Sequence, residues 1–152
     1  KEFLRGETYF LRPSPYTTIL EPGNAREIIT VSAYDDRNGS FYASSGRGYT
    51  RLGLIKPDFA APGVSISTAL GKRTGTSLAT AISAGAAAQF LQWAVVEENQ
   101  PWVENREIRN YLIRGARRQT VNGTTYQTYP NREEGFGKLS ISGTFDILAG
   151  TD

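Results

Sequence analysis

The feature that most constrains this chain is a long apolar helix predicted to begin beside a serine. Ala and other apolar residues dominate positions 80–96 and no proline interrupts them. This pattern predicts a helix that begins at Thr76 or Ser77, since both are good N-cap residues. Small or apolar residues fall on nearly every face, and a helix that is apolar all round is usually buried. We therefore expect a core helix with Ser77 at its mouth.

The position of Ser77 has two interpretations. In the first, Ser77 only caps the helix, as serine commonly does. In the second, its hydroxyl is chemically active, because the first N–H groups of a helix lack internal partners and carry partial positive charge. Those N–H groups would stabilise an oxyanion beside the serine. The stretch alone favours capping, and the rest of the chain favours the active serine.

Composition excludes several classes of protein. With 152 residues, 39% hydrophobic and 21% charged, the chain fits one globular domain with a real core. A net charge of +2 gives no broad basic field for nucleic acid. No apolar stretch approaches the ~20 residues needed to cross a membrane. We therefore expect neither a nucleic acid nor a membrane as a partner, and the absence of cysteine excludes a disulfide.

The absence of histidine is the strongest limit on the chemistry. A serine hydroxyl is a poor nucleophile at neutral pH and needs a nearby base, which in the triad pattern is a histidine oriented by a carboxylate. This chain cannot complete such a triad alone. It also begins with Lys1 and contains no methionine. We interpret it as the C-terminal piece of a larger protein.

A coarse reading of the chain predicts an α/β fold. Residues 1–16 hold a short β-like run and two prolines, and we expect them to be the end of an inserted β domain or a linker. The continuous apolar run 27–34 suits a parallel strand buried on both faces. The remaining predicted elements are strands at 59–60 and 64–69 with Val64 and Ile66 inward, a helix at 106–114 capped by Asn105 and ended by Gly115, and a hairpin at 119–129.

The acidic pair Asp35 and Asp36 lies in a segment with turn composition. A solvated turn is the simpler interpretation, because calcium prefers about six to eight oxygen ligands. We expect no cofactor, and calcium at this turn is the alternative.

Two motifs carry a resemblance to a known family. Gly75-Thr76-Ser77-Leu78-Ala79 resembles the Gly-Thr-Ser-x-Ala nucleophile box of subtilisin-like serine proteases, and residues 56–63 resemble the Lys-Pro-Asp-x-x-Ala-Pro-Gly box that precedes it. Residues 17–25 and 135–139 are similar to further subtilase segments. The resemblance covers about residues 17–149, and assigns residues 17–152 to the C-terminal part of a catalytic domain. It implies the C-terminal half of a subtilisin-like, mainly parallel sheet flanked by helices.

The resemblance also implies roles for individual residues. Ser77 matches the nucleophile, and its backbone N–H matches an oxyanion donor. Gly75 and Thr76 match the neighbours that shape the oxyanion side, and Thr74 would lie beside the residue before the scissile bond. Leu20 would lie near the primary specificity pocket and Gly23 at its bend. The chain departs from many relatives in having Ala-Ile at 81–82 in place of Pro-His, which affects helix stiffness rather than chemistry.

A narrower resemblance is to the Csp-type subtilases of spore-forming bacteria, which act in germination. It rests on Ile-Arg-Gly-Ala-Arg-Arg at 113–118, Tyr-Pro-Asn-Arg-Glu at 129–133 and Leu-Gln-Trp-Ala at 91–94. This group implies a β-sandwich insertion before residue 16, an extracytoplasmic or spore-associated location, and a protein zymogen as substrate.

The predicted function is therefore that of a serine endopeptidase fragment, inert alone. Its partners would be an N-terminal part of the same protein, carrying the histidine and aspartate, and a protein or peptide substrate. The alternative is a catalytically inactive pseudoprotease that acts as a binding or regulatory module. A third interpretation, an unrelated α/β binding domain, requires both motifs to be chance.

Overall fold

The computed structural model describes residues 10–118 and 128–150. Most of the predicted hairpin at 119–129 and the start of the predicted linker at 1–16 lie outside the described residues. The elements follow in the order β1 (Val31–Tyr34), β2 (Phe59–Pro62), β3 (Ile66–Thr68), β4 (Gly71–Arg73), α1 (Thr76–Leu91), a π-helical segment η1 (Gln92–Val96), α2 (Asn105–Arg114) and α3 (Ile141–Ala149).

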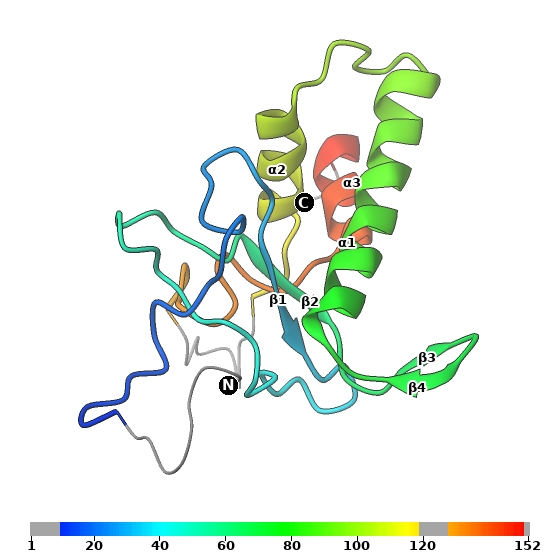
Figure 1. Ribbon diagram of the computed structural model, residues 1–152. Coiled ribbons are helices and arrows are strands. Elements are labelled where there is room, and N and C mark those ends of the chain that lie inside the picture. Colours follow the sequence, from blue (N-terminus) through cyan, green and yellow to red (C-terminus); the bar gives the residue numbers. More distant parts are fainter. Residues whose placement is uncertain (1–9, 119–127, 151–152) are drawn as a thin grey trace.

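The centre of the fold is a parallel pair of strands, as the sequence predicted (Figure 1). Strand β1 pairs with β2 in the register Val31 to Phe59 and Tyr34 to Pro62. The strand is shorter than the apolar run 27–34. Just before it, the amide of Thr30 donates to the Asp58 carboxylate at 2.7 Å, and Thr30 O accepts from Asp58 N at 2.7 Å. Backbone at 137–139 continues the pairing along β2, where Leu139 N donates to Ala60 O at 2.7 Å.

Small side chains bring α1 close to this sheet. Ala33, Ala61 and Ala79 form one fully buried cluster. At Gly63 an added Cβ would lie only 2.7 Å from the Cβ of Ala33, so a larger side chain would push sheet and helix apart. A second cluster of Phe59, Leu112 and Ile113 packs α2 on the same sheet.

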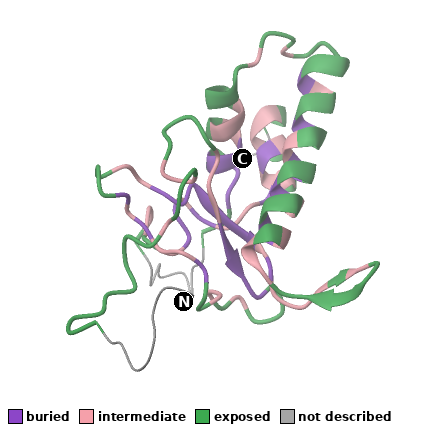
Figure 2. Cartoon of the chain, viewed as in Figure 1, coloured by how far each residue is buried: buried purple, intermediate pink, exposed green. Residues whose placement is uncertain are grey.

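Helix α1 is buried on one side only, which corrects the expectation of a helix buried all round. Its buried residues are Ala79, Ser83, Ala86 and Phe90, and this spacing of three to four residues defines a single face. Figure 2 shows the other side of α1 exposed along its length. Because α1 contacts β1 and β2 through its buried face, it is the core helix of this domain.

The expectation about apolar length also needs correction. Thr76–Val96 forms a 21-residue helix that is long and apolar enough, by length and composition alone, to cross a membrane. Only 28% of its most apolar window is buried within the described part of the chain. The helix therefore leaves a large part of its small, apolar surface without a partner among the described residues.

The predicted strand at 64–69 is instead half of a hairpin. Strands β3 and β4 pair antiparallel, with Thr68 opposite Gly71, and Gly71 takes a φ of 86° that favours glycine. In Figure 1 this hairpin extends away from the rest of the chain. Val64 and Ile66 are only half-buried, and Leu70 at the turn is 79% exposed. The strand is limited to Ile66–Thr68, where Ile66 and Thr68 are half-buried and Ser67 is exposed. The predicted alternation is therefore present, but its inward side is only half-buried and Val64 lies outside the strand.

Helix α2 begins at Asn105, the residue predicted to cap it, so its N-cap lies one residue earlier than predicted. Glu104 is the N-cap, and it forms a capping box with Glu107, whose carboxylate accepts from Glu104 N at 2.9 Å. Gly115 ends the helix as predicted, but its φ of −74° needs no glycine. The reason for glycine is a close approach, because an added Cβ would lie 2.4 Å from the Thr144 nitrogen of α3.

Candidate active site

Four of the six predicted site residues line one cavity. This cavity has a volume of about 910 Å³, and Leu20, Gly23, Thr76 and Ser77 all contribute to its walls. Thr74 and Gly75 precede the helix and do not line it. The structure thus brings the 17–25 segment, predicted to form a specificity wall, next to the predicted nucleophile more than fifty residues later.

The hydroxyl of Ser77 is not used to cap the helix. The N-cap is Gly75, with an extended φ of 163°, and the cap makes no side-chain hydrogen bond. Ser77 is exposed and its hydroxyl donates to no group among the residues the structure describes. It is the second residue of α1, so its own N–H belongs to the first turn and has no intrahelical acceptor. The capping interpretation of Ser77 is therefore wrong.

The start of α1 is fastened to the sheet by backbone hydrogen bonds. Gly75 N donates to Gly63 O at 2.8 Å, and Gly63 N donates to Tyr34 O at 3.0 Å. Tyr34 and Pro62 are the last residues of β1 and β2. Ser77 therefore lies beyond the carboxyl ends of the parallel strands, where open α/β sheets bind ligands. Thr74 is held separately, because its hydroxyl accepts from Ser65 N at 2.9 Å.

One wall of the cavity is the tight bend between Leu20 and Gly23. Gly23 N donates to Leu20 O at 2.9 Å, and an added Cβ on Gly23 would lie 3.0 Å from that same oxygen. The Thr30 hydroxyl donates to Gly23 O at 2.6 Å and ties the bend to the residue before β1. The Leu20 side chain is 81% exposed beside the cavity. The Glu21–Pro22 peptide within this bend is cis.

A buried cluster of charged side chains is linked to this wall through Thr30. Asp58 is fully buried and accepts from Thr30 N at 2.7 Å, from Lys56 Nζ at 2.8 Å and from Arg109 Nε at 2.6 Å. Asp58 therefore joins one backbone amide and two cationic side chains from three separate segments. The sequence analysis did not predict the role of Arg109, because this residue lies in α2, 51 residues from Asp58, and no local sequence pattern indicates the contact.

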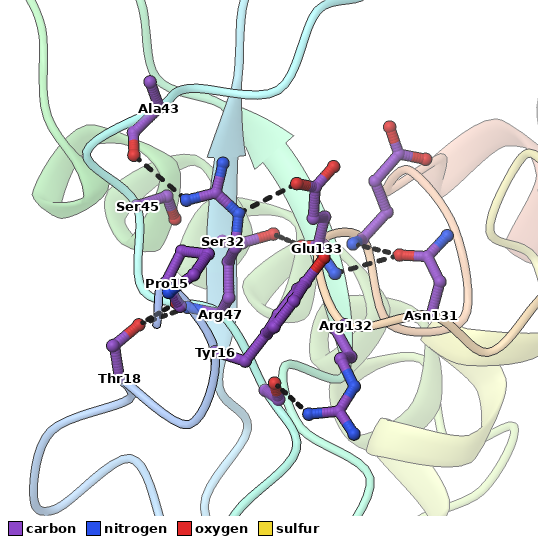
Figure 3. Close-up of polar contacts among 12 residues, drawn as sticks. Pro15, Tyr16, Thr18, Ser32, Ala43, Ser45, Arg47, Asn131, Arg132 and Glu133 are labelled. Atoms are coloured by element: carbon purple, nitrogen blue, oxygen red, sulfur yellow. Dashed lines mark hydrogen bonds and ion pairs between the residues drawn. The ribbon is translucent and has the colours of Figure 1, made fainter. Parts of the chain in front are cut away.

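A second wall of the cavity contains Arg47, which the sequence analysis did not predict. Arg47 O accepts from Thr18 N at 2.9 Å, so the two walls meet at this point. Its Nε donates to Glu133 Oε1 at 2.8 Å, across 86 residues of sequence (Figure 3). The guanidinium also lies 4.5 Å from the Phe41 ring centroid. The charge of Arg47 is therefore neutralised within the wall itself.

The acidic turn has its own partners. Asp35 accepts from Arg37 Nε at 2.9 Å and NH2 at 2.6 Å, and this pairing lowers the pKa of the Asp35 carboxyl. Tyr34 donates to Asp36 at 3.3 Å, and burial is the main cause that raises the pKa of the Tyr34 hydroxyl to about 12. Within residues 10–118 and 128–150, no group of three or more acidic, histidine or cysteine side chains could hold a metal ion.

The comparisons with known proteins agree with this geometry. The model of the Subtilase family matches residues 13–137. The chain belongs to the subtilase family. It is 38% identical over 100 residues to the serine protease AprX of Bacillus subtilis, covering 49% of this chain and 23% of AprX. It is 30% identical over 123 residues to an uncharacterized protein of Aquifex aeolicus, covering 61% of this chain and 56% of that protein.

Solved subtilase structures confirm the α/β fold. The CspB protease of Clostridium perfringens superposes with a TM-score of 0.85 at 34% identity, over 93% of this chain and 31% of CspB. The patellamide maturation protease PatA superposes with a TM-score of 0.66 at 24% identity, over 90% of this chain and 48% of PatA, and supports the fold alone. The chain thus spans about a quarter to just over half of the relatives named here.

Proposed function

We propose that this subtilase chain is the nucleophile-bearing part of a serine endopeptidase. The observation that carries the proposal is the state of Ser77. Its hydroxyl is free of any capping bond, in the first turn of a core helix, and open to a cavity of about 910 Å³ beyond the carboxyl ends of a parallel sheet. A nucleophile for acyl transfer needs this combination of exposure, anion-stabilising N–H groups and room for a substrate.

The proposed mechanism divides the work between this chain and the rest of the protein. Ser77 Oγ attacks the scissile carbonyl, and Ser77 N–H donates to the developing oxyanion. A histidine from another segment takes the hydroxyl proton and returns it to the leaving amine, while an aspartate orients that histidine. A side-chain amide from the same segment completes the oxyanion hole. Since this sequence contains no histidine, the chain alone is expected to be inert.

The other predicted residues have positioning roles in this proposal. Gly75 and Thr76 shape the oxyanion side, and Thr74 lies beside the substrate residue before the scissile bond. Leu20 and Gly23 form the wall of the primary specificity pocket, which fits their place in the cavity of Ser77.

The partner that completes the site would be the N-terminal part of the same protein. The exposed side of α1 supports this proposal, because it continues from Ser77 through the small residues Ala81, Ala84 and Ala88. A helix that carries apolar residues on nearly every face is usually buried. The limited share of CspB and AprX that this chain spans leaves ample polypeptide to cover it.

The finer proposal concerns substrate and location. The structural likeness to CspB and the Csp-like segments at 113–118 and 129–133 support a protein zymogen of spore germination as the substrate. They support an extracytoplasmic or spore-associated location on the same ground.

A fluorophosphonate probe on the full-length protein tests the proposal. We expect an adduct on Ser77 that is lost in Ser77→Ala, and no adduct on this chain alone. As a control, Ser83→Ala removes a buried α1 hydroxyl that donates to Ala79 O at 2.8 Å, and it should leave labelling intact. A folded full-length protein that shows no adduct would favour the inactive pseudoprotease.

A further inference from the structure

A second hollow adjoins the cavity of Ser77. It has a volume of about 530 Å³, and its lining includes Tyr16, Tyr49, Arg132 and Glu133. Pro15 and Arg47 line the first cavity, while the neighbouring Tyr16 and the ion-pair partner Glu133 line the second. Residues 15–16 and the Arg47–Glu133 ion pair therefore form the ridge between the two hollows. Figure 3 shows the ion pair with Pro15 and Tyr16.

The Arg132 guanidinium is held between two aromatic rings in this hollow. Its Cζ lies 5.1 Å from the ring centroid of Tyr16 and 5.0 Å from that of Tyr49. The Tyr49 hydroxyl donates to Pro130 O at 2.9 Å, which fixes one of the rings. Stacking on aromatic faces satisfies a guanidinium without using its N–H groups, which remain available at its edge.

No acidic side chain in the described part of the chain neutralises Arg132. Among the described residues, the one hydrogen bond of its guanidinium runs from Nη1 to Gly48 O at 3.3 Å. The neighbouring acids are engaged elsewhere, because Glu133 pairs with Arg47 at 2.8 Å and Glu134 accepts from the Tyr129 hydroxyl at 2.7 Å. Arg132 is thus an oriented and unpaired cation in an open hollow.

We propose that this hollow is a substrate subsite, in which Arg132 binds the carboxylate of an acidic side chain on the polypeptide to be cleaved. A planar guanidinium with a free edge matches a carboxylate with two parallel N–H···O bonds. The shared ridge lets an extended peptide seated beside Ser77 continue over Arg47 and Glu133 into the hollow. The inference rests on the proposed peptidase function and adds an acidic residue, away from the scissile bond, to its substrate requirement.

The test uses the full-length protein with Ser77→Ala, so that binding is measured without turnover. A glutamate is moved through each position of a fluorescent ten-residue peptide, and each peptide is compared with its glutamine counterpart by fluorescence anisotropy. We expect one position where glutamate tightens binding roughly tenfold, the size of one charge-assisted contact. Arg132→Gln should abolish this preference, Arg132→Lys should keep part of it, and higher salt should weaken it.

Two controls separate this inference from the proposed function. Arg106→Gln, on the exposed side of α2 and outside both hollows, should leave the glutamate preference unchanged. Fluorophosphonate labelling is measured separately, on full-length protein that retains both Ser77 and Arg132. Labelling of Ser77 with equal binding of all glutamate and glutamine peptides overturns the subsite alone. If the full-length protein without substitutions is not labelled by fluorophosphonate, the peptidase proposal is overturned. The comparison of glutamate and glutamine peptides then still decides the subsite.

Discussion

At the scale of single residues, the cavity depends on side chains that hold other groups in place. Thr30 is the clearest case, since its hydroxyl binds Gly23 O at 2.6 Å while its amide binds Asp58 at 2.7 Å. It therefore connects the bend at Leu20 to the buried cluster of Lys56, Asp58 and Arg109. None of these groups takes part in the proposed chemistry, yet the position of the cavity wall depends on them.

Thr30→Val should weaken substrate binding more than it slows chemistry. Valine keeps the shape of threonine but leaves Gly23 O without its donor, at a cost of about 1 kcal/mol in stability. We expect KM for a peptide substrate of the full-length protein to rise a few-fold, with kcat nearly unchanged. Thr30→Ser retains the hydroxyl and should restore KM. An equal fall of kcat in both variants would contradict a positioning role.

The raised pKa of the Tyr34 hydroxyl predicts that the free energy of unfolding depends on pH in the alkaline range. Its pKa of about 12 in the folded protein lies above the ordinary tyrosine value of 10.0, so between these two pH values the folded state keeps the proton while the unfolded state loses it. The contribution of Tyr34 is therefore present below pH 10 and is lost as the pH rises toward 12. Chemical unfolding at pH 9 and pH 11 should show a smaller loss of stability at high pH for Tyr34→Phe than for the unchanged protein. An identical pH dependence would contradict the assignment.

At the scale of elements, close backbone approaches determine how the helices pack. α2 ends at Gly115 where α3 passes, and Gly143 faces it, since an added Cβ there would lie 2.6 Å from Gly115 O. The pair lets α2 and α3 meet without side chains between their backbones. The amphipathic pattern of α2 was readable from sequence, but this contact was not.

Gly115→Ala should destabilise the domain. The added methyl would lie 2.4 Å from both N and Oγ1 of Thr144, so α3 must shift, at a cost of roughly 1–3 kcal/mol. Denaturant unfolding measures this loss. Gly150→Ala provides a partial control, because nothing lies within 4 Å of its Cβ and only its φ of 67° opposes alanine. Equal stability of Gly115→Ala and the unchanged protein would show that the α2–α3 approach is loose.

At the scale of the whole molecule, the elements on both sides of Ser77 expose surface that no other described part of the chain covers. The exposed side of α1 and the extended β3–β4 hairpin flank the nucleophile on either side in sequence. An isolated two-stranded hairpin is marginal in water, and the helix surface is small and apolar. Both features agree with the proposal that another part of the protein covers them.

Ala84→Lys tests this cover directly in the full-length protein. Ala84 is exposed in this chain, so a lysine there should be nearly neutral if α1 faces water. Under another polypeptide segment the buried charge should cost roughly 3–5 kcal/mol. We expect the large loss by denaturant unfolding. Asn110→Lys on exposed α2 is the matched control and should change stability little; an equally small effect at both sites would contradict the cover.

Local composition and short motifs were enough to predict the family, the α/β class, the long helix, the buried parallel strand and the place of Ser77. The sequence also indicated that Leu20 and Gly23 belong near Ser77, through resemblance. The folded structure was needed to show that Gly75 and not Ser77 caps the helix, since capping depends on backbone angles that serine and glycine both permit. It alone found Arg47, Glu133, Arg109 and Arg132, because their partners come from distant segments. Hydrogen bonds and ion pairs between such segments leave no periodic trace in a sequence, so the supports of the site appear only after the chain has folded.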